Sequence, residues 1–199
     1  MKKINEIEQL RSECWDLALY AFGTSYIFSE RALKLKKNIG CINYFGIVVP
    51  LTIGGVAIGY GVNSKLLVIL IPIAAFLSVI QLIVFTWAII KKWDEELSYS
   101  YESATANKLL ADEFECLAKY DHNTEESLSF FSKYQFLKAK NQSREEQDSK
   151  HSIIGHELRK GMRYALRNYK RECTGCKNIP ISMKSTNCDV CGNFKNYRK

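Results

Sequence analysis

Four cysteines near the end of the chain have the spacing of a metal site. Two Cys-x-x-Cys pairs are separated by eleven residues, and the pairs are formed by Cys173, Cys176, Cys188 and Cys191. Each pair presents two thiolates from a tight turn, and two such pairs can close a tetrahedral, all-thiolate site around zinc. Since no coordination position is left open for a substrate, the zinc would be structural and would stabilise a small zinc-ribbon-like knuckle. Two disulfides or an iron–sulfur cluster are the alternatives, and Gly192 suits a turn that needs a positive φ.

The remaining cysteines indicate a reducing compartment. Cys14, Cys41 and Cys116 are scattered, which makes seven cysteines in total. An odd number without a secretory signal favours free thiols and a cytosolic setting for the polar parts of the chain. The first residues, Met-Lys-Lys-Ile-Asn-Glu, are not followed by an apolar run, so they do not form a signal peptide.

Positive charge is concentrated around the cysteines. The formal net charge is +7, yet residues 150–199 hold twelve Lys or Arg against three Asp or Glu. Such an end can bind nucleic acid, anionic lipid or an acidic protein, and charge without a base-reading motif does not separate these partners. The candidate partner-binding residues lie on the helix before the cysteines: Arg159, Arg163, Arg167, Lys170 and Arg171.

No motif in the chain predicts catalysis. His122, His151 and His156 stand on polar stretches without a paired nucleophile. The chain has no phosphate-binding loop, no G-x-S-x-G and no H-E-x-x-H. We therefore expect a protein that is not an enzyme.

The most apolar part of the chain predicts a hairpin of two transmembrane helices. Residues 38–64 and 66–90 carry no charged side chain, and only Lys65 lies between them. Each run exceeds the roughly 20 residues that cross a bilayer core. We place the spans at about 39–61 and 66–90. Lysines and arginines flank both outer ends of the hairpin, so the positive-inside rule predicts that both termini are cytoplasmic. The absence of charge inside the spans disfavours a proton-coupled transporter.

Several residues inside the hairpin are candidates for helix packing or for lining a pore. Gly55 and Gly59 form a G-x-x-x-G motif, which permits close helix contact in lipid. Ser78 and Gln81 lie three residues apart on one face of the second span. A glutamine in lipid needs a partner, and Gln81 either ties the two spans together or serves an oligomer or a pore.

The rest of the chain predicts cytosolic helices, which makes the fold class an all-α membrane protein. Residues 1–37 form an amphipathic helix that Gly23 is expected to weaken locally, and the stretch from 140 to 151 has no apolar residue, which indicates a linker or a solvated helix. The predicted segments are an N-terminal helix (1–37), the hairpin (38–92), cytosolic helices (93–140), a linker with a basic helix (141–171) and the zinc tail (172–199).

The order of these parts resembles two known groups of proteins. Residues 3–140 are similar in architecture to the SLATT family of two-transmembrane effectors. The cysteine tail looks like the pattern that defines the mobilome CxxCx(11)CxxC proteins, with Cys173, Cys176, Cys188 and Cys191 at that spacing. The resemblance implies a bacterial anti-phage effector that oligomerises in the inner membrane and permeabilises it, which causes abortive infection. It also implies a sensor partner, either a retron reverse transcriptase with its DNA–RNA hybrid or a nucleotide-signalling enzyme or its product.

From the residues and the resemblance together, we expect a pore-forming or membrane-disrupting effector with a structural zinc ion. The alternative is a membrane-anchored adaptor that recruits nucleic acid or a protein through its basic zinc tail.

Overall fold

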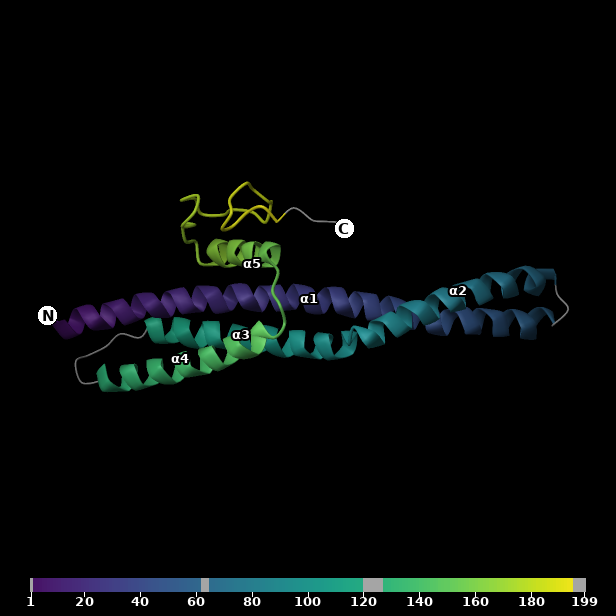
Figure 1. Ribbon diagram of the computed structural model, residues 1–199, viewed down its shortest axis with the longest axis horizontal. Helices are drawn as coiled ribbons and strands as arrows, with labels where there is room; N and C mark the ends of the chain where they lie inside the picture. Colours follow the sequence, from purple (N-terminus) through teal and green to yellow (C-terminus); the bar gives the residue numbers. More distant parts are fainter. Residues whose placement is uncertain (1, 62–64, 120–126, 195–199) are drawn as a thin grey trace. The chain divides into compact units, whose positions relative to one another are not determined.

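The structure is a computed structural model that describes residues 2–61, 65–119 and 127–194 (Figure 1). These residues form helices and irregular loops, and no strand occurs among them. The five helices are α1 (Lys2–Tyr60), α2 (Lys65–Ile90), α3 (Trp93–Lys119), α4 (Ser127–Ser149) and α5 (Gly155–Asn168). The expectation of an all-helical chain is confirmed for this part of the protein. Outside the described residues lie His122, Thr124, which is the predicted N-cap of the helix that follows it, and the basic residues Lys195, Arg198 and Lys199 with the neighbouring Tyr197.

Helix α1 joins two segments that the sequence analysis treats as separate. The predicted amphipathic helix (1–37) and the first predicted span (39–61) form one helix of 59 residues without interruption. The boundary has charged side chains on one side and apolar ones on the other. Asn38 and Gly40 are residue types that often end helices, but no proline follows them there, and the helix continues. A change in polarity therefore marks a change of environment along α1, and the backbone continues through it.

The chain divides into two compact units. Unit 1 comprises Met1–Glu30 and Ser100–Lys199, and unit 2 comprises Arg31–Tyr99. In unit 1, α3 runs antiparallel to α1, and α4 returns antiparallel to α3 (Figure 1). The core of unit 1 is formed by apolar side chains from all four of its helices, and its largest fully buried members are Phe28, Phe114, Phe130 and Leu110.

Helix α4 extends through the polar stretch that lacks apolar residues. Residues 140–149 are helical, and three of their side chains, Asn141, Arg144 and Asp148, are buried. Asp148 accepts hydrogen bonds of 2.7 Å from Ser103 Oγ and from Asn107 Nδ2 on α3. Arg144 Nε and Nη2 also donate to Asp148, at 3.2 and 3.1 Å. The stretch is therefore a helix rather than a linker; most of its side chains are exposed, and the three buried ones pack α4 against α3.

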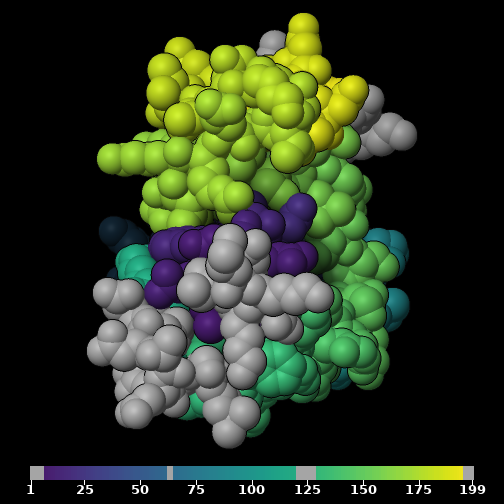
Figure 2. All heavy atoms as spheres, turned by 90° about the vertical axis from the view of Figure 1, so that its left-hand side faces the viewer, coloured from purple at the N-terminus to yellow at the C-terminus, as the bar shows by residue number. Residues whose placement is uncertain are grey.

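Helix α5 packs on the N-terminal half of α1. Tyr164 stacks between Tyr26 and Phe22, with ring centroids 4.0 and 5.4 Å away. Lys160 donates to Glu30 at 2.6 Å beside this stack. Stacked aromatic pairs stabilise by about 0.5–1.5 kcal/mol beyond the area they bury. Figure 2 shows the cysteine tail covering the side of α5 that faces away from α1.

Unit 2 contains the second part of α1 together with α2. Both helices are long and apolar enough to cross a membrane. Among the described residues of α2, only Leu67 and Ala74 are buried, so most of its large apolar side chains are exposed. Pro50 and Pro72 lie inside the two helices. At the other end of α2, Lys91 and Lys92 separate α2 from α3, and Lys92 has a φ of 52°.

Candidate metal centre

Two short loops after α5 position the four cysteines. In the first loop, Lys177 N–H donates to the carbonyl oxygen of Cys173 at 2.8 Å, which closes the turn. In the second loop, Gly192 N–H donates to the carbonyl oxygen of Cys188 at 2.9 Å. Each turn ends at or next to a residue in the left-handed region: Lys177, which closes the first turn, has a φ of 56°, and Asn193, which follows Gly192, has a φ of 49°. The two pairs of cysteines therefore sit on similar knuckles.

Glycine is required at position 192 for a reason that the sequence analysis did not give. We expected a positive φ there, but the only described glycine with a positive φ is Gly61. A Cβ at Gly192 would instead lie 2.5 Å from the carbonyl oxygen of Thr186 and 2.9 Å from the amide nitrogen of Cys188. The expectation was wrong, because close packing of the spacer against the knuckle excludes a side chain, and the left-handed residue is the next one, Asn193.

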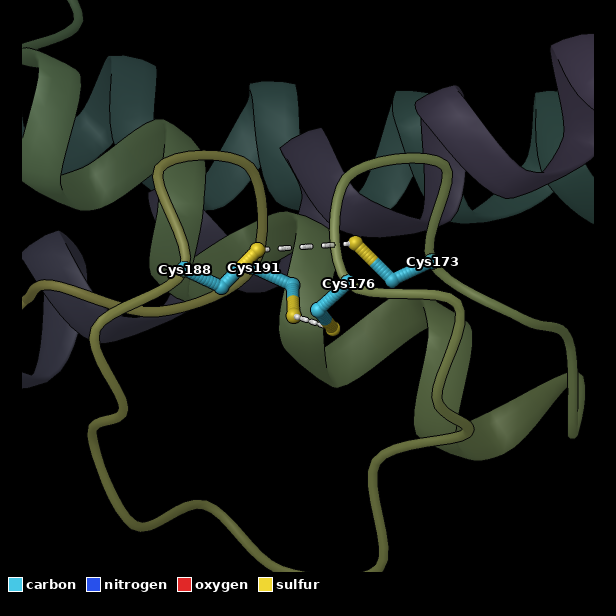
Figure 3. A group of neighbouring side chains, drawn as sticks. All are labelled: Cys173, Cys176, Cys188 and Cys191. Atoms are coloured by element: carbon cyan, nitrogen blue, oxygen red, sulfur yellow. Dashed lines mark hydrogen bonds between the residues drawn. The ribbon is translucent and has the colours of Figure 1, made fainter.

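The four sulfur atoms converge on one point. All four Sγ atoms lie within 4.8 Å of one another, and the cysteines are free (Figure 3). Sγ of Cys173 is 3.8 Å from Sγ of Cys188, and Sγ of Cys176 is 3.8 Å from Sγ of Cys191. Tetrahedral coordination with Zn–S bonds of about 2.3 Å places sulfurs about 3.8 Å apart. The spacing fits one metal ion and is far longer than a disulfide bond of about 2.05 Å.

The cysteine cluster is part of the core of unit 1. Cys173 and Cys191 are fully buried and belong to the same apolar cluster as Cys14 and Ala18 of α1. Burial raises the pKa of the Cys191 thiol, whereas backbone N–H groups of Cys191 and Val190 lower the pKa of the Cys188 thiol to about 7. The fold alone thus favours one thiolate and disfavours another, and a metal ion bound by the four sulfurs would stabilise all of them as thiolates.

The predicted partner-binding residues do not form one surface. Arg163 is buried, and Arg159 Nε donates to the carbonyl oxygen of Asn193 at 3.1 Å. Arg171 Nη1 lies 2.7 Å from Asp16 Oδ1 on α1. Arg167 and Lys170 are exposed. The structure therefore removes Arg163 from any surface that a partner would meet, and it leaves Arg167 and Lys170 available.

The hairpin candidates also differ in their surroundings. A Cβ at Gly46 of α1 would lie 2.6 Å from Nε2 of Gln81 on α2. A Cβ at Gly55 or Gly59 would meet nothing within 4 Å, and Ser78 is exposed. The hairpin therefore closes where Gln81 packs on Gly46, and the G-x-x-x-G motif takes no part in this closure. Sequence reasoning missed Gly46, although Gly46 and Gln81 are almost equally far from the turn.

Comparison with known proteins adds a family to this geometry. The sequence profile of the mobilome CxxCx(11)CxxC protein family matches residues 11–194. The chain belongs to this family. The match covers the helices of both units as well as the cysteines, so the family shares much more than the tail that gives it its name. No curated protein and no solved structure matches the chain. The similarity of residues 3–140 to SLATT effectors stays a prediction.

Proposed function

We propose that this member of the mobilome family is a membrane effector without enzymatic activity, which inserts its hairpin into the bacterial inner membrane and permeabilises it when it oligomerises. The observation that carries the proposal is the exposed apolar surface of unit 2. For example, Leu51, Ile58 and Phe76 are 68%, 89% and 67% exposed. Exposed apolar area of this extent is typical of a surface that meets lipid or another protein.

The ends of the hairpin support insertion with both termini in the cytoplasm. Lys36 and Lys37 precede the first span, and Lys91 and Lys92 follow the second. Nζ of Lys91 lies 5.2 Å from the ring centroid of Trp87, an arrangement suited to the level of the lipid headgroups. Thr52 and Thr86 donate their hydroxyls to carbonyl oxygens one turn earlier, at 2.7 and 2.8 Å, so neither brings an unmet hydroxyl donor into lipid.

Gly55 and Gly59, which make no contact across the hairpin, support oligomerisation. Because Gly46 and Gln81 close the hairpin, the open faces of Gly55 and Gly59 are free to contact a second copy of the chain. Small residues four apart let two helices approach closely where lipid gives no hydrophobic drive for association. We therefore place the contact between copies on the outer face of α1.

The metal centre supports a structural role for zinc. Four thiolate donors without an open position are the donor set of structural zinc sites, and the sulfur spacing fits a single ion. Zinc bound there would stabilise the tail against α5 and, through α5, against α1. In the proposed system, a sensor acts on this cytosolic unit, and the sensor is either a reverse transcriptase with its DNA–RNA hybrid or a nucleotide-signalling enzyme or its product. The outcome is abortive infection.

The decisive experiment measures membrane potential in bacteria that express the chain. A potential-sensitive dye should report depolarisation before growth stops, and the purified chain should release small ions from liposomes of bacterial lipid. The comparison variant is Gln81→Glu, which places an acidic group at the contact with Gly46 inside the hairpin and should lower depolarisation at equal expression. Growth arrest with an intact membrane potential would contradict the proposal.

The alternative function is an adaptor that is anchored by the hairpin and recruits nucleic acid. It is favoured by the exposed cations Arg167, Lys170, Lys177 and Lys184 around the tail. Deleting the tail does not separate the two functions, because Cys173 and Cys191 are part of the core of unit 1. Charge reversal does: Arg167→Glu with Lys170→Glu should abolish nucleic-acid binding and all activity of an adaptor, and it should leave the leakage of liposomes unchanged for a pore.

A further inference from the structure

The buried guanidinium of Arg163 joins helix α5 to the cysteine cluster. Only 6% of the surface of Arg163 is exposed. Its Nε donates to the carbonyl oxygen of Ser182 at 2.7 Å, in the middle of the spacer between the knuckles. Its Nη1 donates to the carbonyl oxygen of Cys191 at 3.3 Å and lies 3.8 Å from Cys191 Sγ. One side chain therefore contacts both the spacer and a predicted metal ligand.

The charge of Arg163 matches the charge of a loaded site. A divalent ion bound by four thiolates retains two excess negative charges. Burial of such a group is costly unless a cation or hydrogen-bond donors lie close to it. Arg163 supplies a permanent positive charge, because its guanidinium stays protonated in proteins. A buried arginine without a nearby anion would be destabilising for the same reason, so the arginine and the loaded cluster stabilise each other.

The position of Arg163 on a rigid element suits it to orient a ligand. It lies two residues from Gly161, where α5 packs against α1, and Gly161 is itself buried. Groups that fix metal ligands act best from helices whose own position is set by packing. The N–H donor of Arg163 is thus held in place by contacts on the opposite side of the same helix.

We propose that Arg163 is a positioning residue of the metal centre, which orients Cys191 by hydrogen bonding and offsets the negative charge of the bound thiolates. This inference rests on the proposed metal centre. It is independent of whether the hairpin forms a pore. Partners of this kind typically change metal affinity by about 10- to 100-fold when they are removed.

The test compares four forms of the full-length chain purified in detergent: wild type, Arg163→Gln, Arg163→Lys and, as a matched control on the same helix, Arg167→Gln. Zinc affinity is measured by competition with a chromophoric chelator. Cobalt(II) replaces zinc for absorption spectroscopy, because the sulfur-to-cobalt charge-transfer band reports on hydrogen bonds to the thiolates. Loss of an N–H donor to sulfur makes the thiolate a better electron donor and moves this band to lower energy.

We expect Arg163→Gln to bind zinc about 10- to 100-fold more weakly, with the cobalt band at lower energy. Arg163→Lys keeps the charge but loses the forked geometry, so its affinity should fall between those of wild type and Arg163→Gln. Arg167→Gln should stay within about twofold of wild type. Helical circular dichroism shows whether Arg163→Gln folds. If it does not fold, the proposal is tested by the shift of the sulfur-to-cobalt band in Arg163→Lys.

Two results with the variants would overturn the proposal. Arg163→Gln could bind zinc as tightly as wild type with an unshifted cobalt band, or Arg163→Gln and Arg167→Gln could lose affinity equally. A wild-type chain that binds no metal would overturn this inference together with the metal centre. Depolarisation of cells by that same chain would still support the pore, so the two failures are distinguishable.

Discussion

Gly23 on α1 and Gly161 on α5 are in backbone contact. A Cβ at Gly161 would lie 2.7 Å from the carbonyl oxygen of Gly23 and 2.8 Å from Cγ1 of Ile27. A Cβ at Gly23 would lie 3.2 Å from the carbonyl oxygen of Gly161. Two helices approach this closely only where neither carries a side chain, so the pair of glycines fixes where α5, and the metal tail that follows it, packs on α1.

Substitution of Gly161 should release α5 from α1. We expect Gly161→Leu to lower the free energy of unfolding of the full chain in detergent by about 1–3 kcal/mol, because the side chain collides with the backbone of α1. Thermal unfolding followed by circular dichroism measures the change. Gly155→Leu on the same helix is the control, since the nearest atom to a Cβ there is Nη1 of Arg159 at 3.5 Å. Equal losses for both variants would show that the crossing point has no special role.

The sequence predicted helix α3 well, and the reason is its regular apolar stripe. The expected cytosolic helices began at residue 93, where α3 begins, and the buried Leu110, Phe114 and Leu117 of α3 recur at helical spacing. The second half of α4 was not predicted to pack, because burial of a polar side chain depends on its partner. Asp148 is buried only since Ser103 and Asn107 lie opposite it, and their positions in the chain are more than forty residues away.

The cysteine cluster could be predicted because its signal, like the apolar stripe of α3, lies within one short segment. The role of Arg163 beside the cluster could not. Two Cys-x-x-Cys turns encode a metal site within a short segment, and the structure brings all four sulfurs together. Arg163 was predicted to bind a partner together with the other cations of its helix. Helix α5 instead lies between α1 and the tail, so Gly161 and Arg163 are both buried while Leu158 is half exposed.

Removal of Asp148 should be among the most damaging single changes in unit 1. Asp148→Ala leaves the donors of Ser103, Asn107 and Arg144 without their shared carboxylate in a buried setting. We expect a loss of about 3–5 kcal/mol in the free energy of unfolding. Asp112→Ala is the control, because its ion pair with Lys108 is about half exposed and should be worth less than about 1 kcal/mol. A loss below 1 kcal/mol for Asp148→Ala would contradict the importance of the buried network.

The thiol of Cys14 should be almost unreactive. It is fully buried, and burial raises its pKa from the usual value of 9.0 to about 11. At pH 8 its thiolate fraction is then about 100-fold below that of an ordinary thiol. Since the folded pKa is the higher one, the stability that the neutral thiol contributes is complete below about pH 9 and is lost as pH rises toward 11.

Alkylation with iodoacetamide, read by mass spectrometry, tests this difference. The exposed Cys116 provides the internal comparison in the same molecule. Modification of Cys14 should lag far behind that of Cys116 at pH 8 and should accelerate between pH 9 and 11. Equal rates at pH 8 would show that α1 is not packed as the structure has it.

The metal should stabilise unit 1 as a whole, because Cys173 and Cys191 are in the same core as α1. We expect about one zinc ion per chain, and we expect its removal by a strong chelator to lower the thermal unfolding temperature of the full chain. Cys173→Ser should have the same effect without chelator, and Cys116→Ser, at an exposed position, should have none. Zinc content well below one per chain after purification with added zinc would contradict a metal centre.

Leucine at position 55 should weaken contact between copies without opening the hairpin. A Cβ at Gly55 meets nothing within 4 Å in the same chain, so Gly55→Leu has room in the monomer and obstructs only a neighbour. We expect cross-linking in membranes to show fewer oligomers and depolarisation of cells to fall at equal expression. Gly46→Leu is the contrasting variant, because its side chain would displace the amide of Gln81 and should loosen the contact between α1 and α2 inside the hairpin. Unchanged oligomers and depolarisation with Gly55→Leu would place the contact between copies elsewhere on the hairpin.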